Sequence, residues 1–101
     1  MDMRHLLEQA KALERALKET DERLGKHESE GSAGGGVVKA RVNGAGEVTF
    51  LSISPELLAG RDAGLITQTV LAALKQASSA ARAYREKERA ALTGGLKLPD
   101  Y

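Results

Sequence analysis

The two histidines are the first residues to consider for chemistry, because imidazole serves so often in proton transfer and metal binding. His5 and His27 are the only histidines in the chain, and they lie 22 positions apart with no carboxylate cluster around either. The chain has no cysteine, so it has no thiolate for a metal, a disulfide or nucleophilic catalysis. We therefore expect no metal, no cofactor and no enzymatic activity, and we expect both histidines on exposed helix surface.

Glutamates in the first third of the chain could serve acid–base chemistry, but a basic residue follows each of them four positions later. The pairs are Glu14 and Lys18, Glu19 and Arg23, and Glu22 and Lys26. This spacing is typical of ion pairs on a helix surface, and such pairs contribute only ~0.3 to 0.5 kcal/mol each. The glutamates therefore indicate a solvated helix face.

The glycine-rich run from Gly31 to Gly36 has the glycine spacing of a phosphate-binding loop. Val37 and Val38, however, stand where such a loop needs Lys and Ser or Thr, and a helix is expected before the run instead of a strand. Glycine disfavours a helix here. We expect a loop or flexible lead into a strand, at a place where another backbone approaches closely.

A line of cations in the last third is the most informative polar feature. Lys75, Arg82, Arg85 and Arg89 follow one another at steps of 7, 3 and 4, roughly opposite an apolar stripe that includes Ile66, Val70, Ala77 and Tyr84. The first helix has similar cations (Lys18, Arg23 and Lys26), but glutamates interleave with them. The line is either a surface that contacts phosphates or a solubilising helix face, and the pattern alone leaves both open.

Composition fits one ordinary soluble domain. The chain has 101 residues, of which 42% are hydrophobic, 29% charged and only 3% aromatic, so its core must be small and aliphatic, and dimerisation would enlarge it. The formal net charge of +1 gives no bulk indication of a nucleic-acid partner. No signal peptide or membrane span is evident, and we expect a cytoplasmic protein.

The first helix is predicted by a heptad seam. Its members are separated by alternating steps of 3 and 4: Met3, Leu6, Ala10, Leu13, Leu17, Thr20 and Leu24. We predict a long helix over 1–27. At 1.5 Å per residue it is roughly 37 Å long, so part of it should project from a domain of this size or meet a partner.

A β-hairpin is predicted over 31–53, including its glycine-rich lead. Val38, Ala40 and Val42 alternate with basic residues, and the turn 43–46 begins with Asn-Gly. In the second strand, simple alternation puts Val48 and Phe50 on one face and Leu51 and Ile53 on the other. Both faces of the sheet should therefore be covered, by the chain's own helices or by a second copy.

Helical signals return after the hairpin. Ser54 and Pro55 read as a cap and first position of a short helix over 55–59. A second long helix is predicted over 62–92, ended by Thr93-Gly94-Gly95, with a flexible tail over 93–101. The fold class is α+β, with two long helices flanking a small antiparallel sheet.

Four pieces of the chain together resemble one family. They are residues 30–39 (EGSAGGGVVK), 42–48 (VNGAGEV), 53–58 (ISPELL) and 92–99 (LTGGLKLP). In this order and spacing they are similar to the bacterial YbaB/EbfC nucleoid-associated proteins, over essentially the whole chain. Two features depart from the family: Ser54 stands where an acidic residue is common, and the second long helix is rich in alanine.

The resemblance implies an intertwined, tweezer-like homodimer with projecting helices that binds duplex DNA with limited sequence preference, in the cytoplasm at the nucleoid. It implies no enzyme activity and no cofactor. We expect DNA contacts from Lys75, Arg82, Arg85 and Arg89, helped by Lys18, Arg23 and Lys26. We expect the dimer interface to comprise Val38, Ala40, Val42, Val48, Phe50, Leu51 and Ile53.

The rival hypothesis is a structural or adaptor dimer that grips a protein, for instance one linked to recombination or replication, with incidental DNA binding. The near-neutral total charge favours it. An amphipathic membrane-surface helix is a weaker third hypothesis, because the apolar stripes lack Trp and Phe anchors. No small-molecule substrate is expected.

Overall fold

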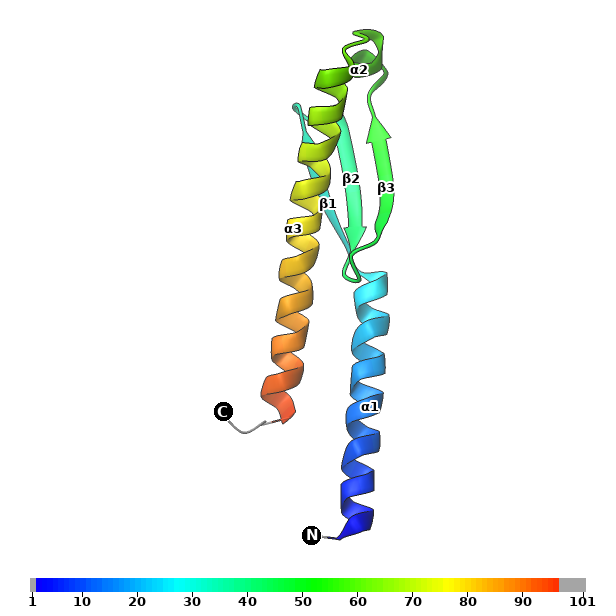
Figure 1. Cartoon of the computed structure of the whole chain (residues 1–101), viewed down its shortest axis with the longest axis vertical. Coiled ribbons are helices and arrows are strands. Elements are labelled where there is room, and N and C mark those ends of the chain that lie inside the picture. The colour runs from blue at the N-terminus through cyan, green and yellow to red at the C-terminus, as the bar shows by residue number, and fades with distance from the viewer. Residues whose placement is uncertain (1, 97–101) are drawn as a thin grey trace.

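A computed structural model describes residues 2–96 as an elongated molecule of 69 × 24 × 16 Å. Its elements in order are α1 (Met3–Lys26), β1 (Glu28–Ala33), β2 (Val38–Asn43), β3 (Val48–Ile53), α2 (Pro55–Ala59) and α3 (Ala63–Leu96). α3 crosses the sheet and then continues beside α1, and both long helices project from the end of the sheet opposite α2 (Figure 1). The predicted α+β class is confirmed.

Both long helices begin at an aspartate cap. The Asp2 carboxylate accepts a hydrogen bond from the Arg4 amide at 3.2 Å, and the Asp62 carboxylate accepts one from the Leu65 amide at 3.1 Å. Such caps satisfy amide groups that have no partner inside the helix. α1 then leaves helical geometry at His27.

The end of α3 corrects one prediction. Thr93, Gly94 and Gly95 do not stop the helix, which continues to Leu96. Glycine costs only about 1 kcal/mol per residue inside a helix, so a glycine pair weakens it without forbidding it. The rest of the predicted flexible tail, residues 97–101, lies outside the described residues.

The sheet has three antiparallel strands in the order β1-β2-β3, one more than the predicted hairpin. β1 pairs with β2 from Glu28 opposite Asn43 to Ala33 opposite Val38. Its sequence lacks apolar alternation, so its strand conformation comes from β2 beside it and α3 beneath it. Only residues 34–37 form the loop, where Gly34, Gly35 and Gly36 all have positive φ, a conformation natural to glycine.

The β2–β3 hairpin is confirmed at its predicted place. The Asn43 side-chain oxygen accepts from the amides of Ala45 and Glu47 at 3.0 and 2.9 Å, which closes the turn. A bulge between Arg41 and Val42 shifts the register, so that Val48 pairs with Val42 while Phe50 pairs with Arg41. The expectation that Val48 and Phe50 share a face is therefore wrong, because the extra residue breaks simple alternation.

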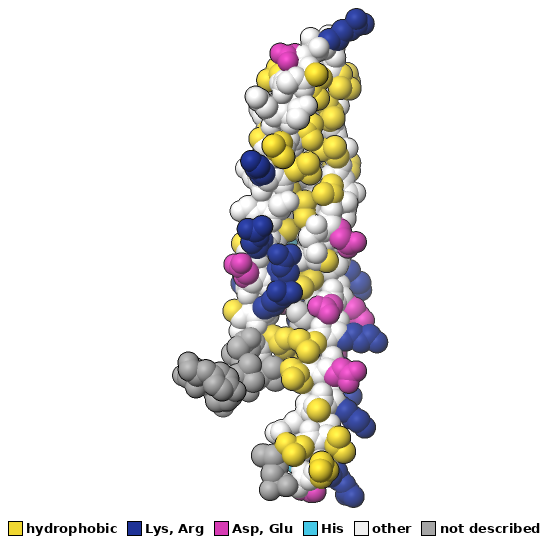
Figure 2. Space-filling view, viewed as in Figure 1, with side chains coloured by type: hydrophobic (Ala, Val, Ile, Leu, Met, Phe, Trp, Pro, Cys, Tyr) yellow, Lys and Arg dark blue, Asp and Glu magenta, His cyan; other side chains and the backbone are white. Residues whose placement is uncertain are grey.

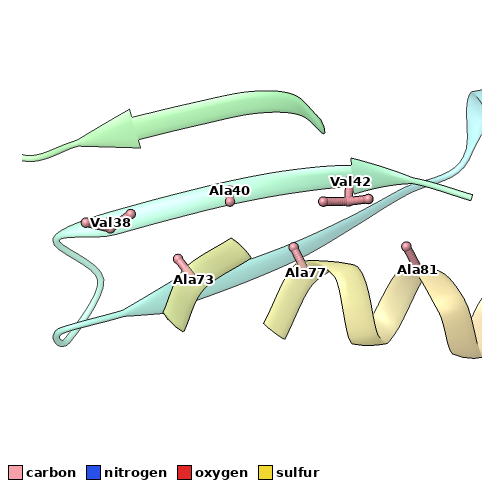
Figure 3. Close-up of a cluster of buried hydrophobic side chains, with 6 residues drawn as sticks. All are labelled: Val38, Ala40, Val42, Ala73, Ala77 and Ala81. Atoms are coloured by element: carbon pink, nitrogen blue, oxygen red, sulfur yellow. The ribbon is translucent and has the colours of Figure 1, made fainter. Parts of the chain in front are cut away.

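Small side chains form the core between sheet and helix. Val38, Ala40 and Val42 face Ala73, Ala77 and Ala81 of α3, and all six are at most 1% exposed (Figure 3). Gly31 of β1 lies so close to α3 that an added Cβ would stand 2.5 Å from the Ala77 amide nitrogen. The alanine-rich helix thus has a structural cause, since larger residues would hold it away from the sheet.

This core corrects part of the predicted dimer interface. Val38, Ala40 and Val42 are buried under α3 of the same protomer, so they present no surface to a partner. The physical reason is that α3 supplies apolar cover to β1 and β2. β3 remains at the edge of the sheet, with Val48 57% and Leu51 45% exposed.

Candidate nucleic-acid interface

Three of the predicted DNA-binding cations lie along one exposed line of α3. Lys75, Arg82 and Arg89 are all exposed and separated by seven residues, almost two full turns. Figure 2 shows Lys and Arg side chains gathered on the lower half of α3 with little acidic surface among them, whereas basic and acidic side chains mix along α1. This contrast agrees with the charge pattern read from the sequence, and we call these three residues the α3 cation line.

Arg85 departs from that line. It is half-buried, and its Nη1 donates a hydrogen bond to the carbonyl oxygen of Gly44, in the turn between β2 and β3, at 3.2 Å. The cause is its place one helical turn beyond Ala81, at the margin of the buried face. Arg85 therefore joins α3 to the hairpin, a contact that the sequence analysis did not predict.

A cleft opens where α1, the hairpin turn and α3 meet. It has a volume of about 510 Å³ and is lined by Asp21 and Leu24 of α1, Ala45 of the turn, and Arg85 and Arg89 of α3. No sequence signal marks it, because its residues come from three distant segments. Asp21 is the one member that the sequence analysis did not single out in any role as a charged group.

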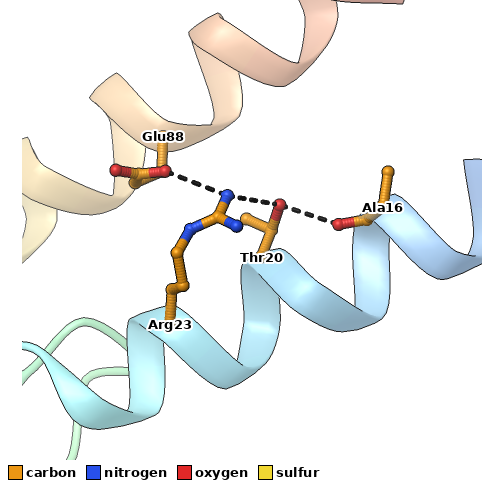
Figure 4. A network of polar contacts seen from close by, with 4 residues as sticks. All are labelled: Ala16, Thr20, Arg23 and Glu88. Carbon is orange, nitrogen blue, oxygen red and sulfur yellow. Dashed lines mark hydrogen bonds and ion pairs between the residues drawn. The ribbon is translucent and has the colours of Figure 1, made fainter.

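The α1 cations occupy different settings. Lys18 and Lys26 are exposed. Arg23 instead reaches across to α3, where its Nη2 lies 3.3 Å from the Glu88 carboxylate and also donates to the Thr20 hydroxyl at 3.3 Å (Figure 4). That hydroxyl in turn donates to the Ala16 carbonyl oxygen at 2.8 Å. Arg23 therefore ties α1 to α3, and its charge is partly neutralised by Glu88.

His27 also lies elsewhere than predicted. Its ring stacks on the Tyr84 ring, with centroids 3.5 Å apart and planes at 11°, and both residues are half-buried. Because His27 directly follows α1, the stack fixes the base of that helix against α3. The expectation of an exposed helix residue is wrong, since the chain at His27 turns toward the sheet and packs on Tyr84.

The heptad seam of α1 is only partly covered within the protomer. Thr20 and Leu24 are buried against the rest of the molecule, whereas Met3, Leu6 and Leu17 are 70%, 44% and 47% exposed. The predicted projection of the first helix is therefore present. Within residues 2–96, no helix is long and apolar enough to cross a membrane.

Apolar surface also remains on β3. Val48, Phe50 and Leu51 are 57%, 40% and 45% exposed, while Ile53 packs partly against the core. The Arg41 guanidinium lies 4.6 Å from the centre of the Phe50 ring, a cation–π contact on the sheet face opposite α3. An edge strand with exposed apolar side chains is a surface suited to pairing with another chain.

Comparison with known proteins places the whole described chain in one sequence family. The family model described as the YbaB/EbfC DNA-binding family matches residues 1–96. A nucleoid-associated protein of an Anaeromyxobacter species is 38% identical over 99 residues, which cover 98% of this chain and 96% of that protein. A nucleoid-associated protein of Chloroflexus aggregans is 35% identical, with 96% of this chain and 97% of that protein covered.

A solved structure supports the same fold. An uncharacterized protein from Helicobacter pylori superposes with a TM-score of 0.75 and 23% sequence identity, over 97% of this chain and 99% of that one. At this identity the likeness concerns the fold alone. The arrangement of two long helices and a small antiparallel sheet is therefore shared with a known structure.

Proposed function

Because the chain belongs to the YbaB/EbfC DNA-binding family, we propose that it works as a nucleoid-associated homodimer in the bacterial cytoplasm and binds duplex DNA through α3. The observation that carries the proposal is the α3 cation line. Lys75, Arg82 and Arg89 are exposed, and none of them lies within 4.0 Å of a carboxylate in the described part of the chain. They are therefore available to displace counterions from a polyanion.

The reach of the line suits contacts with the DNA backbone. From Lys75 to Arg89 the helix rises roughly 21 Å, which corresponds to about six base pairs of duplex. Phosphate contacts position a protein on DNA without reading its sequence. Since the cations are not accompanied on this surface by a group of Asn and Gln side chains suited to base edges, limited sequence preference follows.

The dimer is supported by the small core and the open sheet edge. Four of the seven buried hydrophobic residues are alanines, so one protomer buries little apolar volume. Val48, Phe50 and Leu51 on β3 offer further apolar surface to a second copy, with Ile53 at its margin. A dimer brings two α3 cation lines, and the exposed cations Lys18 and Lys26 of each α1, to the same DNA.

A second candidate function is an adaptor dimer that grips a protein of recombination or replication. The exposed part of the α1 seam (Met3, Leu6 and Leu17) favours it, because such a stripe is a usual docking surface for another helix. In that case the DNA contacts would be incidental. Neither candidate involves catalysis, a cofactor or a small-molecule substrate.

The test is reversal of the α3 cation line, with Lys75→Glu, Arg82→Glu and Arg89→Glu combined. Arg85 is left intact because it holds the hairpin. The matched control reverses Lys11, Lys39 and Arg61, three exposed cations elsewhere. Each variant is titrated with duplex DNA in gel-shift assays at two salt concentrations, and its mass is measured in solution.

We expect the reversal to abolish most binding while the control retains it. With ~0.9 per phosphate contact, neutralising six cations of a dimer removes up to about 5 from the slope of log affinity against log salt. A folded dimer whose DNA affinity is unchanged by the reversal contradicts the proposal and favours the adaptor.

A further inference from the structure

We propose that the cleft between α1, the hairpin turn and α3 holds one phosphodiester of the bound DNA, gripped by Arg85 and Arg89 and weakened by Asp21. This inference rests on the proposed DNA-binding function. It adds a defined anchoring site to a surface that otherwise contacts the backbone diffusely. It also assigns Asp21 a role that lowers affinity.

Arg85 is already held in place at the cleft. Its Nη1 donates to the Gly44 carbonyl at 3.2 Å, and among the described residues this is its one hydrogen-bond acceptor. The guanidinium carries further N–H donors in a fixed fork. Because the side chain is half-buried and fixed by the hairpin, little conformational entropy remains to be lost when an anion binds.

Arg89 supplies the second guanidinium. It lies four residues beyond Arg85, on the same side of α3, and both line the cleft. Neither has a carboxylate within 4.0 Å in the part of the chain that the structure describes. Two guanidinium forks at one cleft suit the tetrahedral oxygens of a phosphate, which arginine binds bidentately.

The walls of the cleft strengthen such an interaction. Leu24 is only 3% exposed, and Ala45 adds a second apolar side chain. Apolar walls lower the local dielectric, so charge attraction is stronger here than on open helix surface. The volume of about 510 Å³ accommodates a phosphate with its flanking sugars.

The two sides of the α1–α3 junction differ in charge balance. Arg23 and Glu88 form an ion pair on one side, 3.3 Å apart. On the cleft side two arginines face a single carboxylate, Asp21, with which neither pairs within 4.0 Å among the described residues. The cleft therefore keeps net positive charge, while Asp21 opposes an anion that enters it.

A DNA phosphodiester is favoured over a free small anion because Arg89 belongs to both the cleft and the α3 cation line. A backbone that follows Lys75 and Arg82 reaches Arg89 next and thus arrives at the opening of the cleft. A soluble phosphate would make no use of that continuity.

The test compares single substitutions with matched controls in DNA titrations at 0.1 M salt. Lys75→Gln removes one ordinary phosphate contact and should weaken binding at most roughly eightfold. Arg89→Gln should weaken it roughly tenfold to hundredfold, because charge-assisted hydrogen bonds are lost as well. Arg89→Lys should fall between these values, since it keeps the charge and loses the fork.

Asp21→Asn provides the opposite signature. It keeps the shape and removes the charge, and it should tighten DNA binding roughly threefold to tenfold. Glu22→Gln, the neighbouring exposed carboxylate outside the cleft, should have a clearly smaller effect. Circular dichroism melts of all variants check that the fold is retained.

Equal losses for Arg89→Gln and Lys75→Gln, together with equal gains for Asp21→Asn and Glu22→Gln, overturn the cleft even if reversal of the α3 cation line abolishes binding. If that reversal also has no effect, the proposed function fails with it. Competition by inorganic phosphate at millimolar concentration, lost in Arg89→Gln, assigns the cleft to a free anion and overturns the DNA anchor.

Discussion

Gly31 offers the sharpest test of how α3 packs on the sheet. A Cβ added at this position would lie 2.5 Å from the Ala77 amide nitrogen and would also overlap the carbonyl oxygen of Ala73. Both opposing atoms belong to the backbone of α3, so no side chain can rotate away. The substitution Gly31→Ala therefore forces β1 and α3 apart along the only face that carries the core.

The expected cost follows from that geometry. Overpacking of a core usually costs ~1 to 3 kcal/mol, and rigid main-chain neighbours put Gly31→Ala at or above the upper value. For a domain of this size 1 kcal/mol shifts the melting temperature by about 4 to 8 °C, so we expect a decrease of at least about 12 °C. The loss should also appear in the free energy of unfolding from urea titrations.

Gly25→Ala is the matched control. Gly25 lies in the last turns of α1, and an added Cβ there meets nothing within 4 Å. Alanine should raise the free energy of unfolding by up to ~1 kcal/mol, because it is the better helix former. Both variants are melted at the same protein concentration, since a dimer's melting temperature depends on it. A Gly31→Ala protein that melts within about 4 °C of the wild type refutes the close contact.

Two further predictions concern the dimer and the helix junction. Leu51→Asp places a carboxylate on the exposed apolar surface of β3, and sedimentation should show the mass of one protomer, whereas Ser32→Asp on the other edge strand should leave the dimer intact; equal masses for the two would remove β3 from the interface. For the Arg23–Glu88 pair, whose side chains are 54% and 23% exposed, a double-mutant cycle of alanine variants should give a coupling below about 1 kcal/mol in urea unfolding; a coupling of several kcal/mol would contradict a solvent-screened pair.

The predictable parts of the fold are those whose signal is local. The α1 seam, the turn that begins at Asn43 and the cap at Ser54 each depend on neighbouring residues, and all three elements are present. β1 escaped prediction because Glu28–Ala33 carries no apolar alternation and becomes a strand through its neighbours in space. The bulge in β3 likewise results from the pairing of two strands, which no single strand encodes.

The candidate interface divides in the same way. Helical periodicity alone was enough to predict the exposure of Lys75, Arg82 and Arg89. The different settings of Arg85, which bonds to Gly44, and Arg23, which pairs with Glu88, depend on where distant segments meet. The cleft itself joins residues from α1, the hairpin turn and α3, so its existence could be learned only from the folded chain.

The way α1 is fastened has a mechanical consequence. Its last turn is held by the Gly44 amide, which donates to the carbonyl oxygens of Leu24 and His27 at 2.7 and 2.9 Å. From Leu24 to Met3 the helix forms a lever roughly 31 Å long, so a rotation of only about 9° at this joint moves its tip by about 5 Å. Small adjustments of a few hydrogen bonds at the base can thus reset the opening between the two long helices to match the width of whatever lies between them.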